Sequence, residues 1–298
     1  MAACAAVTME PMQDGRAEAA DAMMAQAAEA LRSAGIERPV FEAQLLLAIA
    51  LHTSRGSVIA QWPFAISDVV RLRWLDLVAA RAQRRPLAYL RGMQEFYGLP
   101  MNVSPDVLVP RPETELLVDR ALAESERLTC PVIVDACTGS GCVAAALASR
   151  LMHAQIVATD ISRPALEVAR TNLRTHAVGA VPGLVQCCTL RALASEIADI
   201  VTANPPYVSS SDVEELQPEV RDHEPRIALD GGPDGLAVIH DLIPEALRAL
   251  KPHGLLIMEV ALGQSDRAAG ILSTAGFTHI AAYDDLAGIP RVVEGRKP

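Results

Sequence analysis

Aromatic residues are scarce in this chain of 298 residues, at 3% of the composition, although 51% of the residues are hydrophobic. The core must therefore be built mainly from Ala, Val, Leu and Ile, which suits helices and buried parallel strands. The longest apolar run, LLLAIAL at 45–51, is far shorter than the roughly 20 residues of a membrane-spanning helix. The first residues show no basic region followed by an apolar stretch, so the sequence predicts a cytoplasmic protein without a membrane partner.

Basic residues are also fewer than acidic ones, 26 against 36, so the formal net charge is -10 at pH 7. This argues against a general duplex-DNA binder, which needs clustered Lys and Arg for phosphate contacts, but it is compatible with a basic protein partner. The cysteines have no paired metal-ligand spacing, and adjacent residues are poorly placed to bridge each other. They are Cys4, Cys130, Cys137, Cys142, Cys187 and Cys188. The sequence predicts reduced, buried thiols and no metal site.

The length favours two unequal domains. Helical periodicity runs from 17 to about 84 without a strand signal, which predicts an N-terminal helical domain at 1–84. Residues 85–110 contain several glycines and prolines and are predicted to form a β-hairpin connector. A domain at 111–298 follows and begins with a helix that has Pro112 in its first turn.

In this second part, short β-branched runs alternate with helical stretches. The runs are PVIVDA at 131–136, QIVATD at 155–160, ADIVTAN at 198–204 and LLIMEVAL at 255–262. Strands that alternate with helices predict an α/β domain with a parallel sheet covered on both faces.

The segment DACTGSG, Asp135 to Gly141, leaves the first of these strands and opens a helix. Glycines there let backbone N–H groups approach a ligand at the positive end of a helix. Gly139, Gly141 and Ala144 also fit the dinucleotide pattern G-x-G-x-x-A, and Asp160 follows about 20 residues later, where an acidic group binds ribose hydroxyls. The pattern predicts a nucleotide-like ligand, and a glycine turn without a ligand is the alternative.

NAD and S-adenosylmethionine both fit such a loop. Asp135, at the end of the strand, is placed to pair with an ammonium group, which S-adenosylmethionine has and NAD lacks. Alternatively, Asp135 caps the turn through backbone amides.

The sequence NPPY, Asn204 to Tyr207, ends another strand at the carboxyl edge of the predicted sheet, where open α/β folds bind their ligands. An amide nitrogen is a poor nucleophile because its lone pair is delocalised into the carbonyl. The side-chain oxygen of Asn204 and the carbonyl of Pro205 can accept both hydrogens of an NH₂ group, and the Tyr207 ring can pack on its plane. Pro205 and Pro206 have no N–H to compete for these acceptors. An ordinary Asn-Pro turn is the structural alternative.

With these motifs in order, the chain resembles the HemK or PrmC family of glutamine methyltransferases, which modify the Gly-Gly-Gln glutamine of class-1 peptide release factors. The resemblance covers nearly the whole chain. The matching stretches are YLRGMQEFYG at 89–98, LVPRPETELLVD at 108–119, the DxxTGSG loop and NPPYV. It implies a class I, Rossmann-like methyltransferase domain with a C-terminal antiparallel element. It also makes 1–84 a substrate-recognition domain.

By this resemblance S-adenosylmethionine is the cofactor, class-1 release factors are the partners and nucleic acid is not bound directly. The resemblance assigns the NPPY residues to catalysis, and the remaining site residues to the cofactor. The catalytic set is Asn204, Pro205, Pro206 and Tyr207; the cofactor set is Asp135, Cys137, Thr138, Gly139, Ser140, Gly141, Asp160, Cys188, Thr189 and Asn204.

The chain departs from the family pattern at two positions, because Cys137 replaces the first motif glycine and Cys188 replaces an acidic residue. We expect altered cofactor affinity from these changes, with the chemistry intact. Arg111 and Glu115 either orient the cofactor loop or form a surface ion pair, and the lone His223 is interpreted as structural.

Other functions stay open from sequence alone. They are a glutamine methyltransferase of a ribosomal protein, an adenine-N6 DNA methyltransferase, a non-catalytic cofactor-binding paralogue and an NAD oxidoreductase. PRPETE at 110–115 favours the release-factor enzyme over the ribosomal one, and the last alternative leaves NPPY unexplained.

Overall fold

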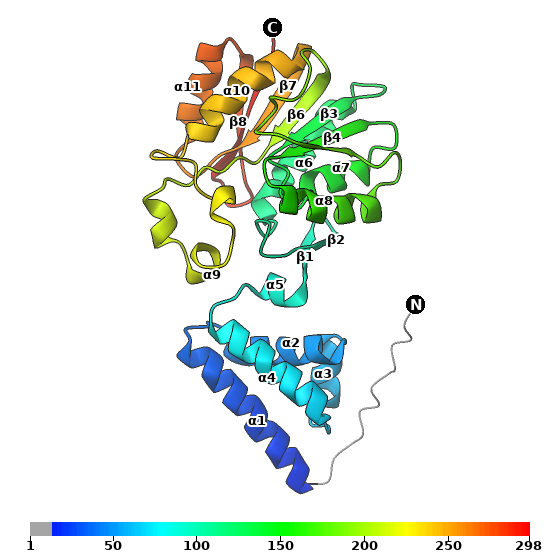
Figure 1. The fold of residues 1–298 in the computed structure, drawn as a ribbon, viewed down its shortest axis with the longest axis vertical. Helices are drawn as coiled ribbons and strands as arrows, with labels where there is room; N and C mark the ends of the chain where they lie inside the picture. The colour runs from blue at the N-terminus through cyan, green and yellow to red at the C-terminus, as the bar shows by residue number, and fades with distance from the viewer. Residues whose placement is uncertain (1–13) are drawn as a thin grey trace. The chain divides into compact units, whose positions relative to one another are not determined.

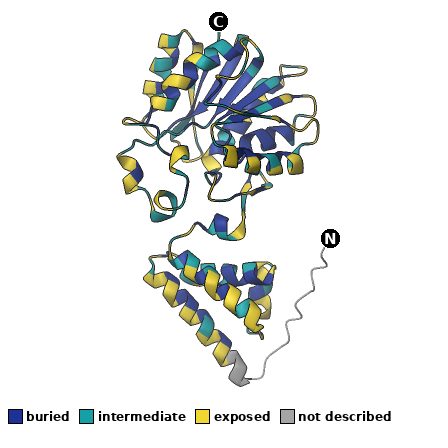
Figure 2. Ribbon diagram, in the orientation of Figure 1, coloured by how far each residue is buried: buried dark blue, intermediate teal, exposed yellow. Residues whose placement is uncertain are grey.

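The computed structural model describes residues 14–298, and side chains from Glu18 onward. Cys4 therefore lies outside the described residues. The chain forms two compact units, Met1–Arg91 and Gly92–Pro298, which are considered separately. Within each unit the buried residues, in dark blue, lie in the interior, and the exposed residues, in yellow, lie on the outward faces of the helices (Figure 2).

The first unit is entirely helical where it is described (Figure 1). Its helices are α1 (Asp14–Ser33), α2 (Pro39–Leu51), α3 (Arg55–Gln61), α4 (Asp68–Ala82) and α5 (Leu87–Arg91). Ser54 and Ser67 cap α3 and α4, because each hydroxyl accepts a hydrogen bond from a first-turn N–H. Trp74 of α4 is fully buried against α2, where its indole N–H donates to the carbonyl of Ala43 at 3.0 Å.

Two details of this unit differ from the periodicity prediction. The helix expected near 41–52 stops at Leu51, since His52 has the left-handed conformation, and α3 starts anew after the Ser54 cap. Residues 87–91, expected within a segment of strands and turns, form α5, in which the N–H groups of Tyr89 and Leu90 donate to the carbonyl of Pro86. Pro86 fits there because a first helical turn needs no N–H donor at that position.

No single helix among the described residues is long and apolar enough to cross a membrane. One bent pair, α2 with α3 at 100°, passes a test of length and composition only when the two are taken together.

The second unit contains a two-stranded hairpin and a seven-stranded sheet. The hairpin is β1 (Met93–Phe96) with β2 (Leu99–Asn102), and the sheet is formed by β3 (Val132–Ala136), β4 (Gln155–Asp160), β5 (Gly183–Gln186), β6 (Ala198–Ala203), β7 (Leu250–Glu259), β8 (Thr278–Asp284) and β9 (Pro290–Arg296). The sheet order is β5-β4-β3-β6-β7-β9-β8, with β9 antiparallel to both β7 and β8 and the other pairs parallel.

Helices cover both faces of the sheet (Figure 1). The helices that pack on it are α6 (Glu115–Ser125), α7 (Cys142–Ala148), α8 (Arg163–His176), α10 (Ala237–Ala249) and α11 (Ser265–Ala275). The unit also contains α9 (Pro218–Arg221) and the short 3-10 helices η1 (Pro112–Thr114), η2 (Asp212–Glu215) and η3 (Arg226–Ala228). Residues of α6, α7 and α8 pack with Ile133 and Ile257 on one face, whereas α10 and α11 pack with Val134 and Met258 on the other. The predicted α/β class with a C-terminal antiparallel element is confirmed.

Strand alternation decides which polar groups reach the site. Side chains two residues apart share a face, so Asp135 follows Ile133, and Glu259 follows Ile257, onto the face covered by α6 and α7. The predicted strand 255–262 in fact begins at Leu250 and ends at Glu259, which makes Glu259 the last residue of β7.

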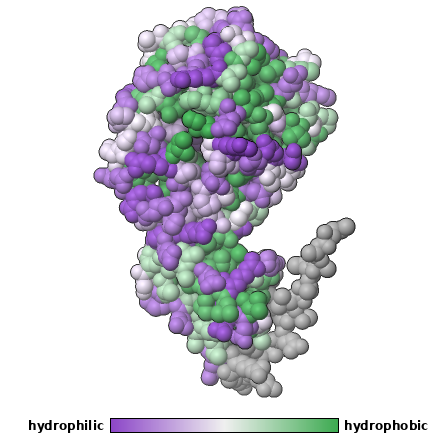
Figure 3. All heavy atoms as spheres, viewed as in Figure 1, coloured by the Kyte–Doolittle hydropathy of each residue, from purple (hydrophilic) through white to green (hydrophobic). Residues whose placement is uncertain are grey.

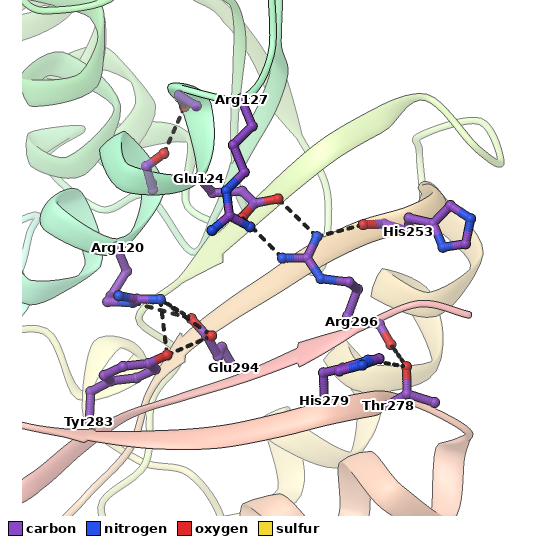
Figure 4. Close-up of polar contacts among 11 residues, drawn as sticks. Arg120, Glu124, Arg127, His253, Thr278, His279, Tyr283, Glu294 and Arg296 are labelled. Carbon is purple, nitrogen blue, oxygen red and sulfur yellow. Dashed lines mark hydrogen bonds and ion pairs between the residues drawn. The ribbon is translucent and has the colours of Figure 1, made fainter.

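The antiparallel edge is fastened to α6 by charged side chains (Figure 4). The Arg120 guanidinium lies 3.9 Å from the centre of the Tyr283 ring and pairs with the buried Glu294 at 3.1 Å. Arg296 of β9 binds both carboxylate oxygens of Glu124, at 2.8 and 3.0 Å. These contacts anchor β8 and β9, which the hydrophobic pattern did not delimit.

In the space-filling view, hydrophobic patches alternate with hydrophilic ones on the face in view (Figure 3).

Candidate active site

A cavity of about 520 Å³ opens where β3 and β6 end at the carboxyl edge of the sheet. The chain runs from β3 outward to β5 and then returns to β6 beside β3, so the cavity lies at the point where the strand order reverses. Most predicted site residues line it: Asp135, Cys137, Thr138, Gly139, Ser140, Asp160, Cys188, Thr189, Asn204 and Pro206. Gly141, Pro205 and Tyr207 are not among the lining residues.

The loop after β3 has the geometry that its glycines suggest. Gly139 and Gly141 both have positive φ, of 54° and 76°. A Cβ on Gly141 would lie 2.9 Å from the Cβ of Ala169 in α8, so only glycine fits there. The Gly139 N–H donates to Asp160 at 2.8 Å, and this bond ties the loop to the end of β4.

Asp135 is buried with no cation as a partner among the described residues. Its two carboxylate oxygens accept hydrogen bonds from the hydroxyls of Thr138 at 2.5 Å and Thr202 at 2.8 Å. Burial raises the pKa of Asp135 to about 6, although these hydroxyl contacts act in the opposite direction. A buried carboxylate that lines a cavity in this state fits an incoming ammonium group, which would compensate its charge.

Asp160 is held by backbone amides on both oxygens. Oδ2 accepts from the N–H of Gly139 and Oδ1 from that of Ser162, each at 2.8 Å. Burial raises the pKa of Asp160, and the backbone hydrogen bonds partly counter that effect. Since a carboxylate has about four acceptor positions, Asp160 retains capacity for a pair of hydroxyl groups.

The two cysteines that depart from the family pattern both line the cavity. Cys137 has a φ of 56°, a conformation in which an L residue is strained and glycine is not. Burial raises the pKa of the Cys137 thiol well above its usual range, so it stays protonated at neutral pH. The five cysteines within the described residues are all free thiols, but the prediction that they are buried was wrong for all except Cys142.

Thr189 lines the cavity, but its hydroxyl is already engaged. It donates to the carboxylate of Glu245 in α10, and Glu245 also accepts from the N–H of Leu190 at 2.8 Å. Thr189 thus contributes backbone and methyl surface to the wall.

The side chain of Asn204 is oriented by a residue of the PRPETE segment. Its Nδ2 donates to the Oγ1 of the buried Thr114 at 3.1 Å. Its Oδ1 receives no hydrogen bond from the described residues, and Asn204 lines the cavity. The Thr114 contact therefore distinguishes the two ends of the amide and leaves an acceptor for a ligand.

The hydroxyl group of Tyr207 has a hydrogen-bond partner within the protein. Its hydroxyl donates to Oε1 of Glu259 at 2.9 Å, and burial raises the pKa of both groups. Oε2 of Glu259 is buried without a hydrogen-bond partner. The hydroxyls of Thr114 and Tyr207 and the charge of Arg291 act against this effect of burial on Glu259.

A second wall of the cavity comes from the segments around Arg111 and His223. Glu224, with a side chain only 1% exposed, accepts from Arg111 at 2.6 Å and from the N–H of Val109 at 3.1 Å. Residues 106–111 and 225–230 both line the cavity. Glu224 therefore joins the two segments of this wall.

Arg111 and Glu115 do not pair with each other. Glu115 instead accepts the N–H of Tyr97 at 2.7 Å, in the turn of the β1-β2 hairpin. Of the two alternatives, a surface ion pair between them is therefore not formed, because they lie on either side of η1 and face different partners.

Sequence reasoning missed Thr114, Glu224 and Glu259 as site residues. Glu259 could have been found from the sequence, since it is the one carboxylate in the apolar run LLIMEVAL. It also lies on the same face of the strand as Leu255 and Ile257. Thr114 lies within the PRPETE segment, but neither its partner nor that of Glu224 could be predicted, because those partners lie 90 and 113 positions away. Among the residues that the structure describes, no group of three or more His, Cys, Asp or Glu could hold a metal ion.

Comparisons with known proteins agree with this geometry. Residues 22–92 match the family model described as the PrmC N-terminal domain, and residues 112–219 match the methyltransferase small domain. A release factor glutamine methyltransferase of Geobacter sulfurreducens is 39% identical over 266 residues, covering 89% of this chain and 92% of the relative. The enzyme of the same name from Bradyrhizobium diazoefficiens is 40% identical over 275 residues, with 90% and 91% covered.

Solved structures support the fold. The hMettl16 catalytic domain aligns with a TM-score of 0.55 at 15% identity, covering 74% of this chain and 81% of that one. A methyltransferase of Pyrococcus furiosus aligns with a TM-score of 0.50 at 15% identity, covering 73% and 98%.

Proposed function

The chain belongs to the family of release factor glutamine methyltransferases, and from this premise we propose that it methylates the glutamine of the Gly-Gly-Gln motif in class-1 peptide chain release factors. The methyl group is transferred to the side-chain amide nitrogen. The observation that carries the proposal is the Asn204 side chain, which has its Nδ2 bound by Thr114 and its Oδ1 available in the same cavity as Asp135 and Asp160.

S-adenosylmethionine is the proposed cofactor, and the cavity residues fit it. Asp135 would pair with its ammonium group, Asp160 would accept from its ribose hydroxyls, and the small residues of the loop from Cys137 to Gly141 would let the backbone lie close against it. A cavity of about 520 Å³ is within the size range of small-molecule sites. When bound, S-adenosylmethionine supplies a methyl group on a positively charged sulfur. Cys188 and Thr189 are proposed to contact the rest of the cofactor.

For the acceptor, Asn204 Oδ1 and the Pro205 carbonyl would each accept one hydrogen of the glutamine NH₂ group. Two acceptors fix the plane of the amide and aim the nitrogen into the cavity, which is a positioning effect. Because Pro205 and Pro206 have no N–H, neither supplies a competing donor. Tyr207 is assigned to support this loop through its hydrogen bond to Glu259. No general base is required, since the nitrogen loses a proton readily once it becomes cationic.

Residues 1–84 are proposed as the substrate-recognition domain, 85–110 as a connector and 111–298 as the methyltransferase domain. The first assignment is supported by the match of 22–92 to the PrmC N-terminal domain and by the cavity residues, which all belong to 106–238. A substrate that takes part in translation favours the cytoplasm as the location, with no direct contact to nucleic acid.

The test incubates the full chain with radiolabelled S-adenosylmethionine in parallel reactions, which contain purified release factor, ribosomal proteins or DNA as the substrate. We expect label in the release factor and, by mass spectrometry, one added methyl on its Gly-Gly-Gln glutamine. Label in a ribosomal protein or in adenine instead would reject the proposal. Calorimetry with S-adenosylmethionine and NAD tests the cofactor separately, since heat from NAD alone would reject it.

A further inference from the structure

Two arginines of the helical unit stack on one aromatic ring. The guanidinium of Arg38 lies 4.3 Å from the centre of the Phe41 ring, and that of Arg55 lies 4.2 Å from it. Arg38 directly precedes α2 and Phe41 lies in its first turn, whereas Arg55 is the first residue of α3. Two helices thus bring two cations to one ring, and we call these three residues the arginine patch.

The positive charge of the arginine patch is not compensated within the described residues. Arg55 donates only to the neutral side chain of Gln44, at 3.1 Å, and neither guanidinium forms an ion pair. Of the two acids next to the arginine patch in the chain, Glu42 pairs with Arg81 at 2.6 Å, and Glu37 forms no ion pair with a described residue. A cation over a ring keeps its charge, so the arginine patch remains a doubly positive site. Arg32 and Arg71, by contrast, each pair with a carboxylate one turn away.

Exposed aliphatic residues lie beside the arginine patch. Val40, between Arg38 and Phe41 in the chain, is 47% exposed. Ile59, one turn after Arg55 on α3, is 46% exposed. Arginine and an aromatic residue with an apolar rim is the composition of energetically important sites in protein–protein interfaces.

The arginine patch also stands out against the charge of the whole chain. Residues 1–91 contain ten basic and nine acidic residues, whereas residues 92–298 contain 16 basic and 27 acidic ones. The first unit is therefore close to neutral and the second strongly acidic, so long-range repulsion of an acidic partner is weaker at the first unit.

We propose that the arginine patch binds an acidic segment of the protein substrate, through carboxylates that reach Arg38 and Arg55. The inference rests on the proposed function, which makes the substrate a folded protein. Two fixed planar guanidiniums match carboxylates in pairs, and the apolar rim suits a polypeptide. Binding of a nucleic acid would require a longer row of cations for its phosphates, and the acidic second unit disfavours it.

The main experiment measures initial rates for the full chain with Arg38→Glu and Arg55→Glu combined. With folded release factor we expect KM to rise about 5- to 30-fold, the range that follows when an interface loses a major contact. KM for a short Gly-Gly-Gln loop peptide should rise much less. Combined Arg32→Glu and Arg71→Glu is the matched control, since it makes the same change in net charge in the same unit, and it should behave like the wild type.

Arg38→Lys with Arg55→Lys separates charge from geometry. It keeps both charges but loses the planar stack, so an intermediate KM is expected, and a melting curve shows that each variant is folded. An unchanged KM for folded release factor in the charge-reversed protein, or an equal rise for the peptide, would overturn the inference.

A binding measurement that does not depend on methylation separates this inference from the proposed function. Fluorescence anisotropy with a labelled decaglutamate peptide should show salt-sensitive binding to the wild type and loss of binding in the charge-reversed variant. This result supports the arginine patch even if release factor is not methylated. Binding of a single-stranded oligonucleotide, but not of decaglutamate, through the same two arginines would instead reject a protein partner.

Discussion

The side-chain nitrogen of Asn204 donates a hydrogen bond of 3.1 Å to the hydroxyl of Thr114, a residue 90 positions earlier in the chain. This contact connects the end of β6 with the start of α6 and selects which end of the Asn204 amide faces the cavity. The PRPETE segment and the NPPY motif are therefore parts of the same site. Thr114 positions Asn204, and Asn204 is proposed to hold the substrate amide.

Replacing Asn204 with Ala should reduce the methylation rate by about 10² to 10³, the usual effect of removing one preorganised polar contact at a reacting centre. Affinity for S-adenosylmethionine, measured by calorimetry, should stay near the wild-type value. Asn204→Asp keeps an acceptor but adds a charge beside the cationic sulfur, which would stabilise the ground state, so it should be impaired as well. A wild-type rate in the Ala variant, or a loss explained by weak cofactor binding, would contradict the assignment.

Thr114→Val should lower kcat by about 5- to 10-fold, because the loss of one hydrogen bond of about 1 kcal/mol frees the Asn204 amide to rotate. KM for the cofactor should not change. Thr114→Ser keeps the hydroxyl and is the control that should restore kcat. If Val and Ser reduce kcat equally, packing around Thr114 matters more than its hydrogen bond.

Asp135 should make cofactor binding depend on pH. Only the ionised carboxylate pairs with an ammonium group, and its pKa in the ligand-free protein is about 6. Affinity should therefore be constant above pH 7 and about tenfold weaker at pH 5. Asp135→Asn should bind weakly at every pH, with this dependence removed. A pH profile shared by both proteins would assign the titration to another group.

The same carboxylate should destabilise the ligand-free protein at high pH. A folded-state pKa raised from 3.8 to about 6 means that the folded chain holds the proton more tightly than the unfolded chain. The stabilisation that this proton gives to the folded state is complete below pH 4 and is lost as the pH rises through 6. The free energy of unfolding falls by about 3 kcal/mol over this range. Asp135→Asn should thus raise the melting temperature at pH 8 but not at pH 4.

Cys137 offers a test of backbone strain, since its φ is 56°. Cys137→Gly should be tolerated, because relief of about 1–2 kcal/mol of left-handed strain balances the lost side chain and the added chain entropy. Cys137→Val should be destabilised relative to Gly by at least that amount, because branching at Cβ worsens the same strain. Chemical denaturation of both variants measures the difference, and equal stabilities would mean that the loop relaxes.

Arg111→Ala should destabilise the protein by about 1–3 kcal/mol, because it leaves the buried carboxylate of Glu224 with only the N–H of Val109. Glu224→Gln is the matched partner, and the double variant should lose less than the sum of the two single effects. Hydrogen exchange should locate the loss at 223–235. Additive effects would show that the pair is not coupled.

Local chemistry in the sequence determined much of this protein. Alternating β-branched runs and helices predicted the α/β class, and the strands 155–160 and 198–204 lie within one residue of β4 and β6. The glycines of the cofactor loop predicted a tight turn, and Gly139 and Gly141 have positive φ angles, although Cys137 in the same loop adopts one against its own steric preference. The resemblance named the family, and the comparisons confirm it.

Contacts between distant segments could be decided only by the tertiary structure. The hydroxyl of Thr202 that holds Asp135 comes from the neighbouring strand, and the pairing follows from the register of β3 with β6. The same is true of Thr114 on Asn204, Glu259 on Tyr207 and Glu224 on Arg111. A sequence records which groups can donate and accept, but hydrogen bonds act over about 3 Å. Which of these groups meet, and which carboxylates are left buried without a cation, depends on how the strands align and how the helices pack on them.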